Sequence, residues 1–229
     1  TDFIRQLAEV GVIVLLFNAG LESNLSEFKK SGKTSFIVAV MGVIIPLIGG
    51  TILAYCINHG KVENVSAFVQ NIFIGSVLTA TSVSITVETL RELGKVSTSV
   101  GNIIVGAAII DDVLGMLVLT IITSLAGSSV SVIKVIVKIV GFFIFSIIVG
   151  IITYKLFNKW VDKYDIDKRR FVIVSFVICL LLSFSAEEFF GVADITGAYI
   201  AGLVLSSNKE TIYITKRFET LSYILLSPV

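Results

Sequence analysis

Apolar runs of membrane-spanning length follow one another along almost the whole of this 229-residue chain. The hydrocarbon core of a bilayer is about 30 Å thick, and about 20 helical residues cross it. Most runs approach that length, and no polar linker long enough to form a soluble domain separates them. We therefore expect an all-α polytopic membrane protein in which residues 1–229 form a single transmembrane domain of about seven helices plus part of an eighth. The expected segments are Leu7–Leu21, Thr34–Ile57, Phe68–Leu90, Val100–Ala126, Val130–Phe157, Phe171–Phe190, Gly191–Leu205 and Ile212–Val229.

Composition supports a membrane protein. Hydrophobic residues make up 55% of the chain and charged residues 15%, whereas soluble domains carry about 25% charged residues. The basic residues lie between apolar runs, so we expect the lipid bilayer, and not nucleic acid, as partner. The chain begins without Met close to one apolar run and ends inside another. We expect it to be a piece of a longer protein.

The loop charges predict an orientation. If successive segments cross the membrane alternately, fourteen of the eighteen Lys and Arg residues fall on one side. Lys and Arg are enriched in cytoplasmic loops, so this side should face the cytoplasm of a cell inner or plasma membrane. The predicted cytoplasmic loops are 22–33, 91–98, 155–170 and 206–217.

Two adjacent acids, Asp111 and Asp112, interrupt the apolar run Val100–Ala126. At 1.5 Å per residue, Asp111 lies roughly 17 Å from Val100, near the bilayer midplane. The acids oppose insertion by about 5–7 kcal/mol, and the Val, Ile and Leu residues of the run favour it by about 4–8 kcal/mol. A chain tolerates such a balance when the acids face a cavity and handle a cation or a proton. Neighbouring helical residues point about 100° apart, so both carboxylates cannot face the same spot.

The run Phe68–Leu90 contains a stretch of small and hydroxyl residues, from Gly75 to Ser84. In lipid, such residues either let helices pack closely or supply oxygen ligands where the backbone unwinds. The stretch lies at membrane depth one segment before the acids, and hard cations prefer carboxylate, hydroxyl and carbonyl oxygens. This favours a cation site over close packing alone. We expect the two segments to cross at the midplane with Thr81 or Ser82 near Asp112.

Other polar residues have local explanations. We expect Asn18 to satisfy nearby backbone and Glu88 to be an interfacial charge or a partner of Arg91 at i, i+3. Asp194 is expected to act as the N-cap of a helix. The small residues Gly197, Ala198, Ala201 and Gly202 predict a helix-packing surface.

Four motifs follow one another in an order typical of one transporter superfamily. Leu16–Glu22, with the sequence LFNAGLE, resembles the LFxAGLE signature of the monovalent cation:proton antiporter superfamily. Thr79–Val83 together with Leu90–Gly94 resembles its broken-helix segment and the loop that follows. Gly106–Gly115, with the sequence GAAIIDDVLG, resembles its ion-binding helix, and Gly197–Leu203 resembles a later helix. The resemblance covers nearly the whole chain.

The resemblance implies a sodium/proton-antiporter-like fold, with inverted repeats of broken helices. One domain would carry the ion and a second would form a homodimer. Phe68–Leu90 would be one of two broken helices. The second, and a basic residue that pairs with one aspartate, would lie in helices outside this chain, so the chain alone is not expected to transport.

The resemblance also implies residue roles. Asp112 matches the carboxylate that coordinates the ion and exchanges it for protons, and Asp111 matches the neighbour that pairs with the basic residue. Thr81 and Ser82 match the unwound crossing and would offer hydroxyl or carbonyl ligands. The implied activity is antiport of Na⁺, or of K⁺ or Li⁺, against H⁺, with no cofactor and no enzymatic reaction.

Three other functions remain possible. Potassium-efflux relatives often carry a different residue at the first position of the acid pair, so Asp111 favours sodium. A gated cation channel would need a continuous polar pore, whereas the polar midplane residues here fall in two segments only. An intramembrane aspartyl protease would need acids from two helices that face each other, and Asp194 is expected near the outer surface.

Overall fold

The structure is a computed structural model that describes residues 2–57, 65–126, 131–163 and 168–226. These residues form helices and no strand, which confirms the predicted all-α class. Each apolar run corresponds to one helix, except that Phe68–Leu90 is divided into two. The helices are α1 (Asp2–Glu22), α2 (Leu25–Ile57), α3 (Ala67–Val77), α4 (Val83–Glu92), α5 (Ser99–Leu125), α6 (Val132–Lys163), α7 (Lys168–Glu188), α8 (Asp194–Leu205) and α9 (Thr211–Leu226).

Four helices contain stretches long and apolar enough to cross a bilayer. They are Lys30–Ile57 in α2, Ser99–Leu125, which is α5, Val132–Val161 in α6 and Lys168–Glu188, which is α7. Helices α3 and α8 are apolar but shorter. These properties confirm a polytopic membrane protein.

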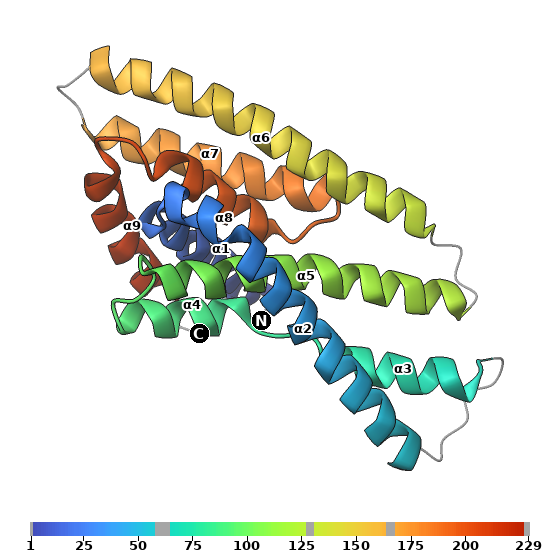
Figure 1. The fold of residues 1–229 in the computed structure, drawn as a ribbon. Coiled ribbons are helices and arrows are strands. Elements are labelled where there is room, and N and C mark those ends of the chain that lie inside the picture. Colours follow the sequence, from blue (N-terminus) through green and yellow to red (C-terminus); the bar gives the residue numbers. More distant parts are fainter. Residues whose placement is uncertain (1, 58–64, 127–130, 164–167, 227–229) are drawn as a thin grey trace.

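The helices pack as two groups. Helices α1, α7, α8 and α9 enclose the larger apolar core, whose fully buried members include Phe17, Tyr199 and Phe218. Helices α2, α3 and α5 form the second group, and Figure 1 shows α2 and α3 extending to the lower right, away from α6 and α7. Helix α4 contacts both α1 and α5, so it joins the two groups.

Small residues bring the helix axes together, as their spacing in α8 predicts. A Cβ atom added at Gly202 would overlap the carbonyl oxygen of Phe17 in α1, and one added at Gly197 would overlap that of Leu182 in α7. In the second group, a Cβ on Gly50 would lie 2.9 Å from the Cα of Gly75. The backbones approach closely at all three positions because no side chain separates them.

Helix ends gather on two opposite sides, in the alternation expected for successive crossings. Helices α4, α6 and α8 end toward the left of Figure 1, where α5, α7 and α9 begin. The ends of α2, α5 and α7 lie toward the right. Polar contacts hold the left side together: Lys168 pairs with Glu210 at 3.0 Å, and Asn208 donates to Asn158. This is the side for which the basic residues predict a cytoplasmic location.

The predicted cytoplasmic loops are shorter than the sequence suggested. Helix α6 continues to Lys163 and α7 begins at Lys168, so helix occupies most of 155–170. Helix α2 likewise begins at Leu25 and α9 at Thr211. The extension of α6 has a helical pattern: Phe157 and Val161, four residues apart, are buried in the larger core, while Lys155 and Lys159 are exposed.

Candidate ion-binding site

The break between α3 and α4 occupies residues 78–82 and is built from hydroxyl groups. At the end of α3, the Thr79 hydroxyl donates to the carbonyl oxygen of Ser76 at 2.7 Å, and the Thr79 N–H donates to the same oxygen at 3.1 Å. At the start of α4, the Ser82 hydroxyl accepts the N–H of Ile85 at 3.4 Å as an N-cap. Ser and Thr side chains compete with helical backbone bonds in this way. The hydroxyl-rich sequence therefore ends one helix and begins the next.

Asp111 lies where α5 passes this break. The Thr81 hydroxyl donates to Oδ2 of Asp111 at 2.9 Å. Asp111 is only 8% exposed, and its Oδ1 is buried without a hydrogen-bond partner among the described residues. On the α2 side, a Cβ added at Gly42 would lie 3.7 Å from this Oδ1. The acid thus sits between α2 and the break, and Gly42 leaves room beside it.

Asp112 has different surroundings. It is half-buried, and its carboxylate accepts no hydrogen bond within the described parts of the chain. The sequence placed Thr81 or Ser82 near Asp112, whereas the hydrogen bond of Thr81 goes to Asp111 and the Ser82 hydroxyl caps α4. The difference follows from the angle of about 100° between neighbouring helical residues. The proximity of Asp112 to the break remains a prediction.

The break combines oxygen atoms with two helix ends. Carbonyl groups at the C-terminus of α3 carry partial negative charge, and N–H groups at the N-terminus of α4 carry partial positive charge. Transporters use such half-helix ends to hold ions near the membrane midplane. Carboxylate, hydroxyl and carbonyl oxygens are the donors that a hard cation prefers.

A second polar cluster lies at the other end of α4, and the sequence analysis did not identify it. The guanidinium Nε of Arg91 lies 3.5 Å from Oε1 of Glu22 in α1. Its Nη1 donates to the hydroxyl of Ser222 in α9 at 3.1 Å. The amide Nδ2 of Asn18 also donates to Oε1 of Glu22, at 3.4 Å. We call Asn18, Glu22, Arg91 and Ser222 the α4 clasp.

The expectation for Asn18 is wrong, because its amide bonds the Glu22 side chain and not local backbone. Arg91 pairs with Glu22 across helices, and Glu88 forms no ion pair in the described residues. The other expectation for Glu88, an interfacial charge, remains a prediction. The expectation for Asp194 is also wrong. The N-cap of α8 is Ala193, and Asp194 is the first helical residue, whose Oδ1 accepts the N–H of Ile195 at 2.7 Å. The only sequence observation that could have pointed to the Glu22–Arg91 pair is that both residues lie in loops predicted on the cytoplasmic side of the membrane.

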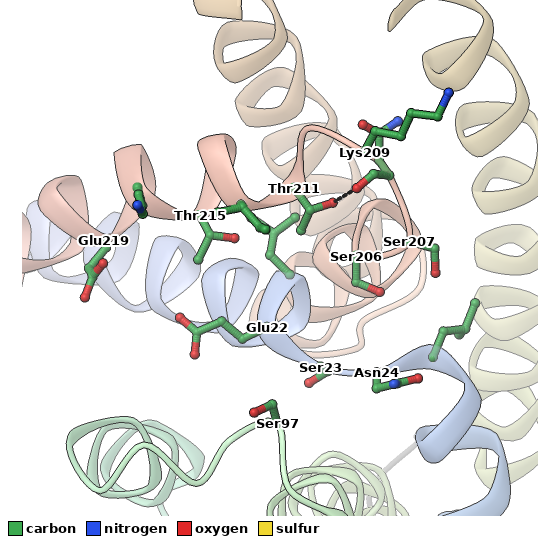
Figure 2. A pocket seen from close by; sticks show the side chains of 15 residues that line it. Glu22, Ser23, Asn24, Ser97, Ser206, Ser207, Lys209, Thr211, Thr215 and Glu219 are labelled. Carbon is green, nitrogen blue, oxygen red and sulfur yellow. Dashed lines mark hydrogen bonds between the residues drawn. The ribbon is translucent and has the colours of Figure 1, made fainter. Parts of the chain in front are cut away.

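A polar cavity of about 770 Å³ opens beside the clasp on the predicted cytoplasmic side. Figure 2 shows Glu22 of α1 and Glu219 of α9 among the side chains that line it, with Lys209 at its far edge. Asn24, together with serine and threonine side chains from the α1–α2, α4–α5 and α8–α9 connections and from α9, completes the labelled lining. The Glu22 carboxylate therefore borders both the clasp and an open polar space.

Comparison with known proteins yields a family and several relatives. The sequence model for "Sodium/hydrogen exchanger, transmembrane" matches residues 1–229. The chain is 36% identical to a probable Na(+)/H(+) antiporter, GerT, of Bacillus cereus, over 100% of this chain and 59% of that protein. It is 34% identical to the Na(+)/H(+)-K(+) antiporter GerN of the same species, over 100% of this chain and 57% of that protein.

A third relative, a Na(+)/H(+) antiporter of Enterococcus hirae, is 33% identical over 99% of this chain and 58% of its own length. The chain therefore spans little more than half the length of these relatives.

Proposed function

Because the chain belongs to the sodium/hydrogen exchanger family of transmembrane proteins, we propose that the full-length protein is a secondary transporter that exchanges a monovalent cation for protons. The observation that carries this proposal is the hydrogen bond between Thr81 and Asp111, which joins the helix break to the acid pair. It brings together the hydroxyl-rich stretch and the midplane acids, the two features that the sequence singles out for a cation site.

In this proposal, Asp111 and Asp112 have different roles. Asp112 is the carboxylate that binds either a cation or a proton, and competition between the two couples their movements. Its oxygens are not engaged by hydrogen bonds from the described residues, so they are available to an ion. Asp111 is held by Thr81, lines the site and pairs with a basic residue elsewhere in the protein. Thr81 and Ser82 contribute hydroxyl or carbonyl oxygen from the break.

Sodium is the favoured cation and potassium the second candidate. Two of the relatives are named Na(+)/H(+) antiporters, and GerN is named a Na(+)/H(+)-K(+) antiporter, which supports both ions. We further propose that the protein acts as a homodimer in the plasma membrane, as the family resemblance implies. A transporter of this kind needs no cofactor and catalyses no covalent reaction.

Proteoliposomes containing the full-length protein test the proposal. An imposed pH gradient should dissipate when Na⁺ is added, and more weakly or at higher concentration with K⁺ or Li⁺. Asp112→Asn protein in matched vesicles provides the control. Cation flux that leaves the pH gradient intact would indicate a channel, and a gradient insensitive to all three cations would contradict exchange.

A further inference from the structure

Helix α4 has polar contacts at both of its ends. Just before its N-terminus, the Thr81 hydroxyl meets Asp111 of α5 at 2.9 Å. In its last turn, Arg91 meets Glu22 of α1 and Ser222 of α9. The helix has ten residues, so its ends lie about 15 Å apart. A rigid helix of nearly three turns transmits a displacement at one end to the other.

The clasp end of α4 is firmly packed. The Arg91 side chain is 7% exposed, and Ser222 is 1% exposed. Val83 and Val87 of α4 are buried in the larger core, which α1 and α9 also line. Helix α4 is therefore packed against the first group of helices, and it also contacts α5, the helix of the second group that carries Asp111.

The break removes the helical ladder that would otherwise tie α4 to α3. Residues 78–82 have no continuous helical ladder, because α3 ends at Val77 and α4 begins at Val83. The backbone on this side therefore does not fix where Thr81 stands with respect to Asp111. At the C-terminal end of α4, the helix ends at Glu92, one residue after Arg91, and the α4 clasp lies beside the turn that leads to α5.

We propose that Arg91 is a positioning residue for the ion site, which holds α4 against α1 and α9 so that Thr81 meets Asp111. This inference rests on the proposed exchange function. A displacement of about 1 Å at a site can change a rate or an affinity by up to about 100-fold. Loss of the Arg91 side chain should therefore weaken cation binding at a distance, and it should do so through Thr81.

Cation-dependent exchange by the full-length protein in proteoliposomes tests this inference. We expect Arg91→Gln to raise the KM for Na⁺ by about 10-fold while Vmax stays within about 2-fold, because positioning acts on the bound ion. Arg91→Lys should restore most of the affinity because it keeps the charge that faces Glu22. Lys95→Gln is the matched control, since it removes an exposed positive charge close by, and it should leave KM unchanged.

A double-mutant cycle separates positioning from general loss of stability. Thr81→Val alone should raise KM. Adding Arg91→Gln to Thr81→Val should then change KM by less than about 2-fold more, because Arg91 acts through the Thr81 contact that is already lost. Independent sites would instead multiply their separate effects on KM. Ser222→Ala removes one partner of Arg91 and can replace Arg91→Gln if the latter does not fold. It should raise KM by about 2- to 3-fold, because Arg91 then loses one of the two contacts that hold α4 in position.

Three results would overturn the positioning role while leaving exchange intact. They are an unchanged KM in folded Arg91→Gln and Ser222→Ala proteins, an unchanged KM in Thr81→Val, or multiplicative effects in the double variant. A wild-type protein that exchanges none of Na⁺, K⁺ and Li⁺ contradicts the proposed function, and with it this inference.

Discussion

The carboxylates of Asp111 and Asp112 differ in hydrogen bonding although the residues are neighbours in α5. Oδ2 of Asp111 accepts a hydroxyl bond from Thr81, and its side chain is almost fully buried. Asp112 is half-buried, and no side chain of the described residues hydrogen-bonds to it. An amide at position 111 would keep an oxygen acceptor for Thr81, whereas an amide at position 112 would remove the negative charge that a cation or proton needs.

Substitutions at the two acids should therefore have unequal effects in the full-length protein. We expect Asp112→Asn to abolish cation-driven proton flux, because a neutral amide binds a cation poorly and carries no proton. Asp111→Asn should retain measurable exchange or alter its charge coupling, because the Thr81 bond survives. Proton flux and membrane current in proteoliposomes measure both. Full exchange by the Asp112 variant would refute the mechanism, and equal total loss would refute only the division of roles.

At the scale of helices, the crossing of α1 and α8 depends on two glycines. A Cβ on Gly202 would overlap the Phe17 carbonyl oxygen, and one on Gly20 would overlap that of Tyr199. Gly49 of α2, in contrast, has nothing within 4 Å of an added Cβ. Gly202 and Gly49 provide a matched comparison. Backbone atoms of α1 leave no room for a Cβ at Gly202, whereas a Cβ at Gly49 would enter open space.

We expect Gly202→Ala to lower the Tm of the purified full-length protein by at least about 2 °C. Overpacking destabilises by about 1–3 kcal/mol, and each kcal/mol corresponds to about 2–4 °C in a chain of this size. Gly49→Ala should leave Tm unchanged or raise it, because Ala favours helix over Gly. Thermal unfolding in detergent measures both values. A Tm for Gly202→Ala equal to that of Gly49→Ala would show that α1 and α8 do not cross in this way.

Local sequence predicted the apolar helical segments, and the family resemblance predicted the break, but neither could predict contacts between distant helices. The hydroxyl residues from Gly75 to Ser84 fit the break because their bonding to the backbone is local. The sequence predicted the helix ends less accurately. Helix α6 continues past Phe157, the predicted end, because Val161 is also buried in the larger core. The α4 clasp joins positions 22, 91 and 222, and only the packing of α1, α4 and α9 brings them together.

At the scale of the whole molecule, the distribution of basic residues and the alternation of the helices indicate the same orientation in the membrane. The helix ends at one side carry most of the Lys and Arg residues, and the Lys168–Glu210 pair ties the α7 start to the α8–α9 connection there. Lys159 is exposed near the end of α6 on this side, and Glu188 is exposed at the end of α7 on the other. These two positions are separated by a single membrane crossing, so together they report the orientation.

Cysteine labelling in intact cells tests this orientation. In a full-length protein in which every native cysteine, including Cys56 and Cys179, is replaced by Ser, a membrane-impermeant maleimide should label Glu188→Cys and should not label Lys159→Cys. Lys159 should be protected because it lies among many Lys and Arg residues, and loops rich in these residues stay on the cytoplasmic side. Permeabilised cells should label both positions, which controls for reactivity. Labelling of Lys159→Cys alone in intact cells would invert the topology, and labelling of both would show that α7 does not cross the membrane between them.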